Sequence, residues 1–180
     1  MKKPKTITTE DSKKILHHLN VQDILIFRVS VETGLRISDV LNLRAWYLDK
    51  IMYVQEKKTG KHRIVTLSDD LYAFLRPIKF NAVRNYDKEV YAFPSKRKTN
   101  RSIHRTTYHR HLKKACQKMN IDFSAHSTRK LFAQELLKKT GDIFEVQKQL
   151  NHKYVADTCL YLDIDFKNLM RAATNPNLLQ

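Results

Sequence analysis

Cysteine, glycine and proline are all scarce in this chain of 180 residues, which contains two cysteines, three glycines and four prolines. Cys116 and Cys159 lie far apart and form neither a metal-binding nor a redox pair, so we expect reduced thiols with no functional role. The few glycines and prolines leave few points at which a helix must end. Their scarcity therefore favours a mainly helical protein.

Long apolar runs are missing as well. No stretch approaches the roughly 18 consecutive apolar residues that a membrane-spanning helix needs. The first residues, Met-Lys-Lys-Pro-Lys-Thr, carry charge but are not followed by an apolar segment, which argues against a secretory signal. We expect a cytoplasmic protein with no membrane partner.

Acidic residues are outnumbered by basic ones. Lysine and arginine together number 34, whereas aspartate and glutamate number 18, which gives a formal net charge of +16. A field of this strength favours a polyanionic partner, and nucleic acid is the commonest. Charge alone leaves DNA, RNA and acidic proteins open.

Acids are absent altogether between Glu89 and Asp122. In the same interval, apolar residues at helical spacing from Tyr108 to Met119 predict a helix with one apolar stripe and a basic remainder. A solvated charged face is one explanation, but the lack of acids favours a surface that faces phosphates. The DNA-binding candidates in this stretch are Arg97, Lys98, Arg101 and Arg105.

The remaining periodicity predicts a mainly α-helical domain with a small antiparallel β-sheet. Strands are expected at residues 52–55 and 62–67, on either side of a hairpin loop at 57–61, and a further short strand near Trp46. Thr8 and Asp11 can form a capping box ahead of the first apolar stripe. Further helices are expected at residues 21–31, 37–43, 69–78, 108–119, 127–139, 142–150, 154–162 and 165–173.

Five short features carry groups suited to phosphodiester chemistry. They are Thr33–Asp39 with Arg36 at a helix start, a hairpin lysine within Lys57–Lys61, His126 and Arg129 three residues apart, Leu150-Asn151-His152, and Tyr161. Taken singly, each has a simpler explanation: a surface ion pair between Arg36 and Asp39, a solvated lysine, a helix cap, a helix end, or one tyrosine among eight.

In this order and spacing, the five features resemble the active site of the tyrosine recombinase (phage integrase) family. Thr-Gly-Leu-Arg-Ile-Ser-Asp is similar to the family's first signature, and Leu-Asn-His-Lys with Tyr161 nine residues after His152 is similar to its last. The resemblance extends from about residue 6 to residue 173. Asn151 stands where the family usually has glycine and Lys130 where it often has histidine, but neither departure removes a catalytic group.

The resemblance implies a tyrosine-recombinase catalytic-domain fold for a single domain at residues 1–180, with a core at about 6–163 and a C-terminal tail at 164–180. We expect no N-terminal core-binding domain of the kind that most relatives carry, and the chain is expected to be either a fragment or a single-domain recombinase. The implied partners are double-stranded DNA and, on DNA, further copies of the chain in a tetramer, whereas the free protein can be a monomer. The apolar residues of the tail are expected to dock on a neighbouring subunit, with a tail folded back on its own domain as the alternative.

The resemblance also assigns catalytic roles. Tyr161 is the nucleophile that forms a 3′-phosphotyrosyl bond. Arg36 and Arg129 bind the nonbridging phosphate oxygens, which suits the planar guanidinium fork. Lys58 protonates the departing 5′ oxygen; we prefer it to Lys57 because it adjoins Thr-Gly and because adjacent residues at a strand end point to opposite faces.

The remaining site residues have supporting roles. His126 assists proton transfer near the nucleophile, His152 donates to a phosphate oxygen, and Asp39 orients the arginine–histidine cluster. No metal or other cofactor is required, and the sequence has neither a phosphate-cradling glycine loop nor a metal-ligand cluster.

The activity implied is site-specific DNA recombination, namely integration, excision, inversion or resolution, by an enzyme of a phage or mobile element. Two alternatives are a type IB topoisomerase-like relaxation of DNA and a non-catalytic DNA-binding protein on the same scaffold. The integrase-like signatures count against the first, and the intact set of catalytic residues counts against the second.

Overall fold

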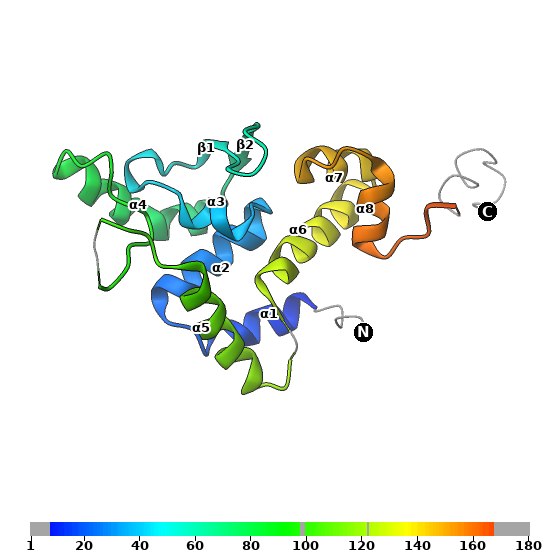
Figure 1. Ribbon diagram of the computed structural model, residues 1–180, viewed down its shortest axis with the longest axis horizontal. Coiled ribbons are helices and arrows are strands. Elements are labelled where there is room, and N and C mark those ends of the chain that lie inside the picture. The colour runs from blue at the N-terminus through cyan, green and yellow to red at the C-terminus, as the bar shows by residue number, and fades with distance from the viewer. Residues whose placement is uncertain (1–7, 98–99, 122, 168–180) are drawn as a thin grey trace. The chain divides into compact units, whose positions relative to one another are not determined.

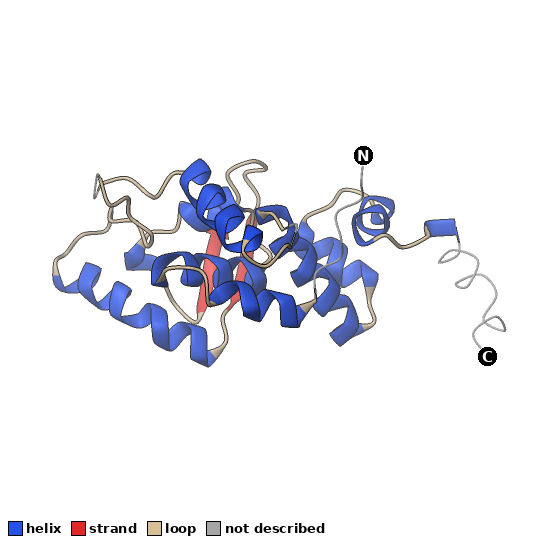
Figure 2. Cartoon of the chain, turned by 90° about the horizontal axis from the view of Figure 1, so that it is seen from below, coloured by secondary structure: helices blue, strands red, loops and turns tan. Residues whose placement is uncertain are grey.

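The structure is a computed structural model that describes residues 8–97, 100–121 and 123–167 (Figure 1). Within these residues most of the chain is helical and two strands form one sheet, as the colouring of Figure 2 shows. The elements are α1 (Thr9–Leu16), α2 (Val21–Thr33), α3 (Ile37–Leu41), η1 (Ala45–Tyr47), β1 (Ile51–Gln55), β2 (His62–Thr66), α4 (Asp69–Arg84), α5 (Arg105–Gln117), α6 (Ala125–Thr140), α7 (Ile143–Leu150) and α8 (Val155–Leu162). The expected mainly α-helical fold with a small antiparallel sheet is confirmed. No helix among the described residues is long and apolar enough to cross a membrane.

The first helices begin and end where local chemistry directs. The expected capping box is present, because the Thr8 hydroxyl accepts from the Asp11 backbone N–H at 3.1 Å and the Asp11 carboxylate accepts from the Thr8 N–H at 3.3 Å. The side chain of Asn20 caps α2 in the same way, accepting from the N–H of Asp23 at 3.0 Å. Gly34 ends α2 with a φ of 62°, the left-handed conformation that glycine adopts most easily.

The sheet is the expected hairpin. β1 and β2 run antiparallel, with Ile51 opposite Thr66 and Gln55 opposite His62. Burial alternates along both strands, so that Met52, Val54 and Val65 point into the core. The hairpin closes through a turn in which Gly60 donates to the Glu56 carbonyl at 2.8 Å.

The chain forms two compact units, Met1–Phe132 and Ala133–Gln180. The core of the first unit lies around α2, which is buried on several sides and packs against α3, α4 and α5. Fully buried residues in this core include Ile26, Val29, Leu71, Leu75, Tyr108 and Leu112. In the second unit α7 packs against α8 and buries Ile143, Val146, Leu150, Cys159 and Leu162. Both cysteines are buried thiols outside any disulfide.

Three expectations about secondary structure need correction. Residues near Trp46 form a 3-10 turn instead of a strand, because the flanking backbone pairs elsewhere: Ala45 N–H donates to Val90 O at 2.9 Å, next to an isolated bridge between Arg44 and Tyr91. α4 continues past Pro77, which removes only one backbone donor, and ends at Arg84. α5 begins at Arg105, before the first apolar residue of its stripe. The helix expected at 165–173 falls largely outside the described residues.

Gly34 lies at a crowded position. A Cβ atom built there would lie 2.2 Å from Cδ1 of Phe132, so this glycine is required both for its left-handed backbone and for lack of space. Gly60 has a similar φ of 68°, but no heavy atom lies within 4 Å of a Cβ built there. A comparison of alanine substitutions at the two glycines therefore separates the free-energy cost of the left-handed backbone from the cost of the clash with Phe132.

We predict that Gly34→Ala destabilises the protein more than Gly60→Ala does. Both substitutions place alanine in the left-handed region, which costs about 1–2 kcal/mol. Gly34→Ala also forces the Phe132 ring to move, at a further cost of about 1–3 kcal/mol. Urea denaturation of the two variants and the wild type measures the difference. Equal losses in free energy of unfolding would mean that the ring gives way freely and that space does not constrain this position.

Candidate active site

The predicted site residues fall into both compact units. Arg36, Asp39, Lys58, His126 and Arg129 lie in the first, whereas His152 and Tyr161 lie in the second. Each group has its own network of contacts.

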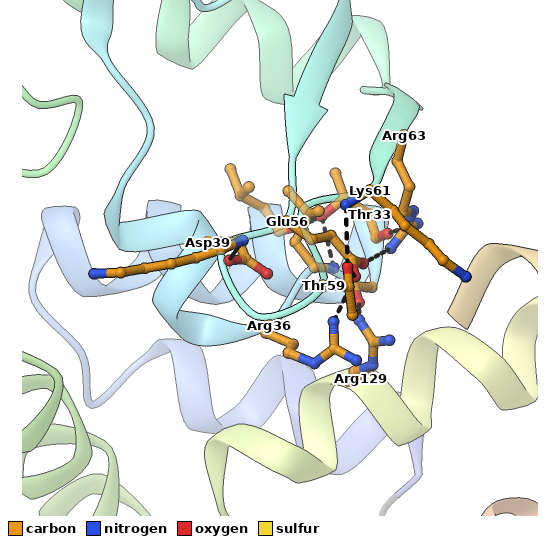
Figure 3. Close-up of polar contacts among 12 residues, drawn as sticks. Thr33, Arg36, Asp39, Glu56, Thr59, Lys61, Arg63 and Arg129 are labelled. Atoms are coloured by element: carbon orange, nitrogen blue, oxygen red, sulfur yellow. Dashed lines mark hydrogen bonds and ion pairs between the residues drawn. The ribbon is translucent and has the colours of Figure 1, made fainter. Parts of the chain in front are cut away.

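Arg36 is the N-cap residue of α3, and its side chain reaches the start of the hairpin turn (Figure 3). Its Nη1 donates to Oε2 of Glu56 at 2.6 Å, so the carboxylate that pairs with Arg36 is Glu56 and not the neighbouring Asp39. The Arg36 side chain remains 24% exposed, so the contact with Glu56 does not bury it completely. Arginine presents several N–H donors in a fixed plane, so one contact does not exhaust it.

Glu56 is a site residue that sequence reasoning missed. Its side chain is fully buried, and its carboxylate also accepts from the Thr59 hydroxyl at 3.0 Å and lies 3.5 Å from Nη1 of Arg63. Burial opposes the charge of Glu56, but the hydrogen bond and positive charge of Arg36 outweigh it and lower the pKa of this carboxyl. Glu56 is therefore a buried anion among arginines.

Asp39 holds the other side of the turn. It is buried, and its Oδ1 accepts from the backbone N–H of Lys57 at 3.0 Å. Within the described residues no hydrogen bond reaches its Oδ2. Burial raises the pKa of Asp39, while the Lys57 N–H and the positive charges of Arg36 and Arg129 partly oppose this shift.

The two candidate lysines lie in the turn itself. Lys57 and Lys58 are both exposed turn residues beyond the end of β1, so strand alternation is the wrong argument for choosing between them. The two lysines differ in their backbone contacts: the N–H of Lys57 donates to Asp39, whereas Lys58 lies one residue nearer the tip of the turn. The choice of Lys58 remains a prediction.

His126 and Arg129 lie near the N-terminus of α6. Arg129 is buried, and its Nη1 donates to the carbonyl of Gly34, two residues before Arg36. His126 is exposed on the same helix, three residues earlier. His109 of α5 has its pKa lowered by burial and then by the positive charges of Arg105 and His126, which indicates that the α5 surface lies near His126.

His152 and Tyr161 approach each other in the second unit. Their rings meet edge to face, with centroids 5.6 Å apart and planes at 85°. Nδ1 of His152 lies 3.0 Å from the hydroxyl of Thr158, a fully buried residue that sequence reasoning also missed. Asn151, which ends α7, has a φ of 58° and so adopts the left-handed conformation for which the family usually has glycine.

The acid-free stretch surrounds a basic hollow in the first unit. Arg97, Arg101 and Arg105 are all exposed, whereas Lys98 lies outside the described residues. A pocket of about 600 Å³ opens beside them, and its basic lining residues are Lys96, Arg97, Arg101, His104, Arg110 and His111. Within the described residues no group of three or more histidine, cysteine, aspartate or glutamate side chains could hold a metal ion.

The raised pKa of Asp39 leads to a prediction about stability. Because the folded state holds this proton more tightly than the unfolded chain, the free energy of unfolding falls as pH rises above the unfolded value near 3.8. Asp39→Asn removes this titration but keeps an oxygen that can accept from Lys57. We therefore expect Asp39→Asn to gain stability relative to the wild type as pH rises from about 4 towards 7.

Asp49→Asn is the matched control. The hydrogen bond from Lys79, at 2.5 Å, lowers the pKa of Asp49, so its charged form stabilises the fold and this contribution is lost only as pH falls through and below the unfolded value near 3.8. The control should therefore differ from the wild type by a nearly constant amount towards pH 7 and approach it in stability below about pH 4. Urea denaturation at several pH values measures both trends. A stability difference between Asp39→Asn and wild type that does not change with pH would contradict the prediction.

Comparisons with known proteins identify the family. The model of the phage integrase family matches residues 5–168. The tyrosine recombinase XerA of Pyrococcus furiosus is 30% identical over 184 residues, which cover 98% of this chain and 63% of that protein. The probable integrase/recombinase YoeC of Bacillus subtilis is 29% identical over 171 residues, which cover 91% of this chain and 89% of that protein.

Solved structures share the fold. A crystal structure of XerA recombinase, 24% identical, superposes with a TM-score of 0.73 and covers 97% of this chain and 65% of that one. The catalytic domain of bacteriophage HP1 integrase, 20% identical, has a TM-score of 0.64 and covers 97% of this chain and 96% of that one. The chain thus spans 63% of the length of the Pyrococcus XerA protein but nearly all of the HP1 catalytic domain. Since the family model matches almost its entire length, the chain belongs to the phage integrase family and has the fold of a tyrosine recombinase catalytic domain.

Proposed function

We propose that this protein is a site-specific DNA recombinase that cuts and rejoins DNA strands through a 3′-phosphotyrosyl intermediate at Tyr161. The observation that carries the proposal is the pair of guanidinium groups from Arg36 and Arg129 (Figure 3). Arg36 donates to Glu56 at the start of the lysine-bearing turn, and Arg129 donates to the carbonyl of Gly34, two residues before Arg36. Two guanidinium groups held this way suit a phosphate that gains negative charge in the transition state. The similarity to XerA tyrosine recombinases supports the same reading.

Cleavage of a DNA strand needs a nucleophile, positive groups that bind the nonbridging phosphate oxygens, and an acid that protonates the leaving oxygen. We call the second of these, Arg36 and Arg129, the clamp. The Tyr161 oxygen attacks the phosphorus and forms a new P–O bond, while the bond from phosphorus to the 5′ oxygen breaks. Arg36 and Arg129 neutralise the nonbridging oxygens, and Lys58 gives the departing 5′ oxygen its proton. A 5′ hydroxyl from another strand then attacks the phosphotyrosine, which restores the phosphodiester and frees the tyrosine.

The two histidines act beside these groups. Nδ1 of His152 lies against the Thr158 hydroxyl and the edge-to-face contact keeps the imidazole beside Tyr161, and in this position we assign His152 the role of donating to a phosphate oxygen. His126 assists proton transfer near the nucleophile, for which its exposed position suits it. Asp39 orients the cluster through the turn that it anchors.

Double-stranded DNA is the proposed partner. The basic hollow of the first unit supports backbone contacts by Arg97 and Arg101, which line it. We include the exposed Arg105 because it belongs to the same acid-free stretch, and Lys98 on the sequence argument alone. We propose a cytoplasmic location. We propose a tetramer on DNA, as in the structure of a lambda integrase tetramer bound to a Holliday junction, with residues 164–180 as the tail that contacts a neighbouring subunit.

We predict that Tyr161→Phe abolishes covalent attachment to DNA while leaving DNA affinity near that of the wild type, because only the nucleophilic oxygen is lost. A nicked suicide substrate followed by a denaturing gel detects the adduct. Tyr154→Phe is the control, since Tyr154 precedes the same helix and is 58% exposed, and it should still form the adduct. An adduct that survives in Tyr161→Phe and disappears in Tyr154→Phe would identify Tyr154 as the nucleophile instead.

We predict that Lys58→Ala slows cleavage by roughly 10²- to 10⁴-fold, the usual contribution of a general acid. A substrate with sulfur in place of the 5′ bridging oxygen has a leaving group that needs no proton, so it should restore the rate of this variant. Lys57→Ala keeps the backbone N–H that Asp39 accepts and should cleave both substrates like the wild type. Rescue of Lys57→Ala by sulfur, with no effect on Lys58→Ala, would reverse the two assignments.

A further inference from the structure

Glu56 occupies a position where an ionised side chain is costly. It follows β1 directly and continues the inward alternation of Met52 and Val54, so that its carboxylate enters the core with no exposed surface. A buried carboxylate is tolerated only when it is paired and hydrogen-bonded. The groups that pair with Glu56 and stabilise its negative charge therefore identify the side chains that it can hold in place.

Those partners come from three separate segments, as Figure 3 shows. Oε2 accepts from Arg36 at the start of α3 at 2.6 Å and from Thr59 in the turn at 3.0 Å. Oε1 lies 3.5 Å from Nη1 of Arg63 in β2, and Nη2 of Arg63 donates to the Thr33 carbonyl at 2.8 Å. One oxygen of Glu56 thus joins the clamp arginine to the turn that carries Lys58.

We propose that Glu56 is a positioning residue that orients the guanidinium of Arg36 and fixes it relative to the Lys58-bearing turn. The proposal rests on the proposed function, which makes Arg36 part of the clamp and Lys58 the acid. Glu56 itself is fully buried and touches no substrate, so it acts only through these groups. Glu56 binds one edge of the Arg36 guanidinium. The remaining N–H donors of that group are therefore held in a fixed direction, in which they can bind a phosphate.

The negative charge of Glu56 matters as well as its shape. Arg63 is buried, and burial lowers the pKa of its guanidinium, while the charge of Glu56 opposes that shift. Arg129 also acts on Glu56 through its charge. A neutral glutamine would keep one acceptor oxygen but would leave these like charges without their central counterion, which weakens the hold on Arg36.

The test compares Glu56→Gln with the wild type and with Glu89→Gln. Glu89 also pairs with an arginine, Arg44, at 3.5 Å, but its side chain is 85% exposed and lies outside the site. Single-turnover cleavage of a suicide substrate should slow roughly 10- to 100-fold in Glu56→Gln, with DNA affinity unchanged, as is usual when a supporting group behind a reactive one is removed. Glu89→Gln should cleave at the wild-type rate. Wild-type cleavage by Glu56→Gln would overturn the proposal.

Modified substrates separate positioning from general damage to the fold. A methylphosphonate at the scissile position lacks one negative oxygen and needs less from Arg36, and a 5′ bridging sulfur needs nothing from Lys58. The deficit of Glu56→Gln should shrink on the methylphosphonate, and in part on the sulfur substrate. An equal deficit on all three substrates would mean a merely structural role and would also overturn the proposal.

A measurement without DNA distinguishes failure of the proposal from failure of the proposed function. In NMR spectra of the free protein, the Arg36 Nη protons should be slowed in rotation and exchange by Glu56 and should lose this signature in Glu56→Gln. Glu56→Asp, which keeps the charge on a shorter side chain and guards against misfolding of the glutamine variant, should retain part of it and part of the cleavage rate. A wild type that makes no adduct would refute the proposed function, whereas unchanged Arg36 signals in Glu56→Gln would refute the positioning role.

Discussion

The buried carboxylate of Glu56 makes it possible for Arg36, Arg63 and Arg129 to share one small region of the first unit. Guanidinium groups repel one another, and the repulsion grows as water is excluded. An anion among them offsets that cost, and its directed hydrogen bond to Arg36 also fixes the direction of that guanidinium. The start of α3, the hairpin turn and β2 are therefore joined by charge as much as by apolar packing.

Features governed by neighbouring residues could be read from the sequence. The Thr8–Asp11 capping box and the hairpin loop at 57–61 each depend on a few residues with particular hydrogen-bonding or backbone properties, and each is present as expected. The remaining features of the fold class were predicted from the resemblance to the tyrosine recombinase family, because the family's signature motifs occur at set positions among its helices and strands. Long-range pairing was beyond this reading: the segment near Trp46 follows its contacts with residues 90–92 and not its own strand-like composition.

Glu56 and Arg63 show a signal that was present but not used. The alternation that places Met52 and Val54 inside also places Glu56 inside, and the same rule in β2 places Arg63 inside. Two inward charges of opposite sign on paired strands predict an ion pair, since neither could be buried alone. Strand alternation could not predict that Arg36 also binds Glu56, because this contact depends on how α3 packs beside the hairpin.

The second unit positions His152 and Tyr161 through tight turns, one hydrogen bond and one ring contact. Its helix α8 has eight residues and lies between Asn151 and Asp163, both in the left-handed conformation, with φ of 58° and 60°. Asparagine and aspartate tolerate this conformation better than most residues, so Asn151 can replace the usual glycine and the chain can still turn sharply before His152. The Thr158 hydroxyl then sets the histidine through one hydrogen bond, and the edge-to-face contact sets Tyr161 beside it. The geometry around the nucleophile thus depends on short-range contacts within α7, α8 and the turn between them, where a left-handed residue, one hydroxyl and one ring contact each fix a particular part.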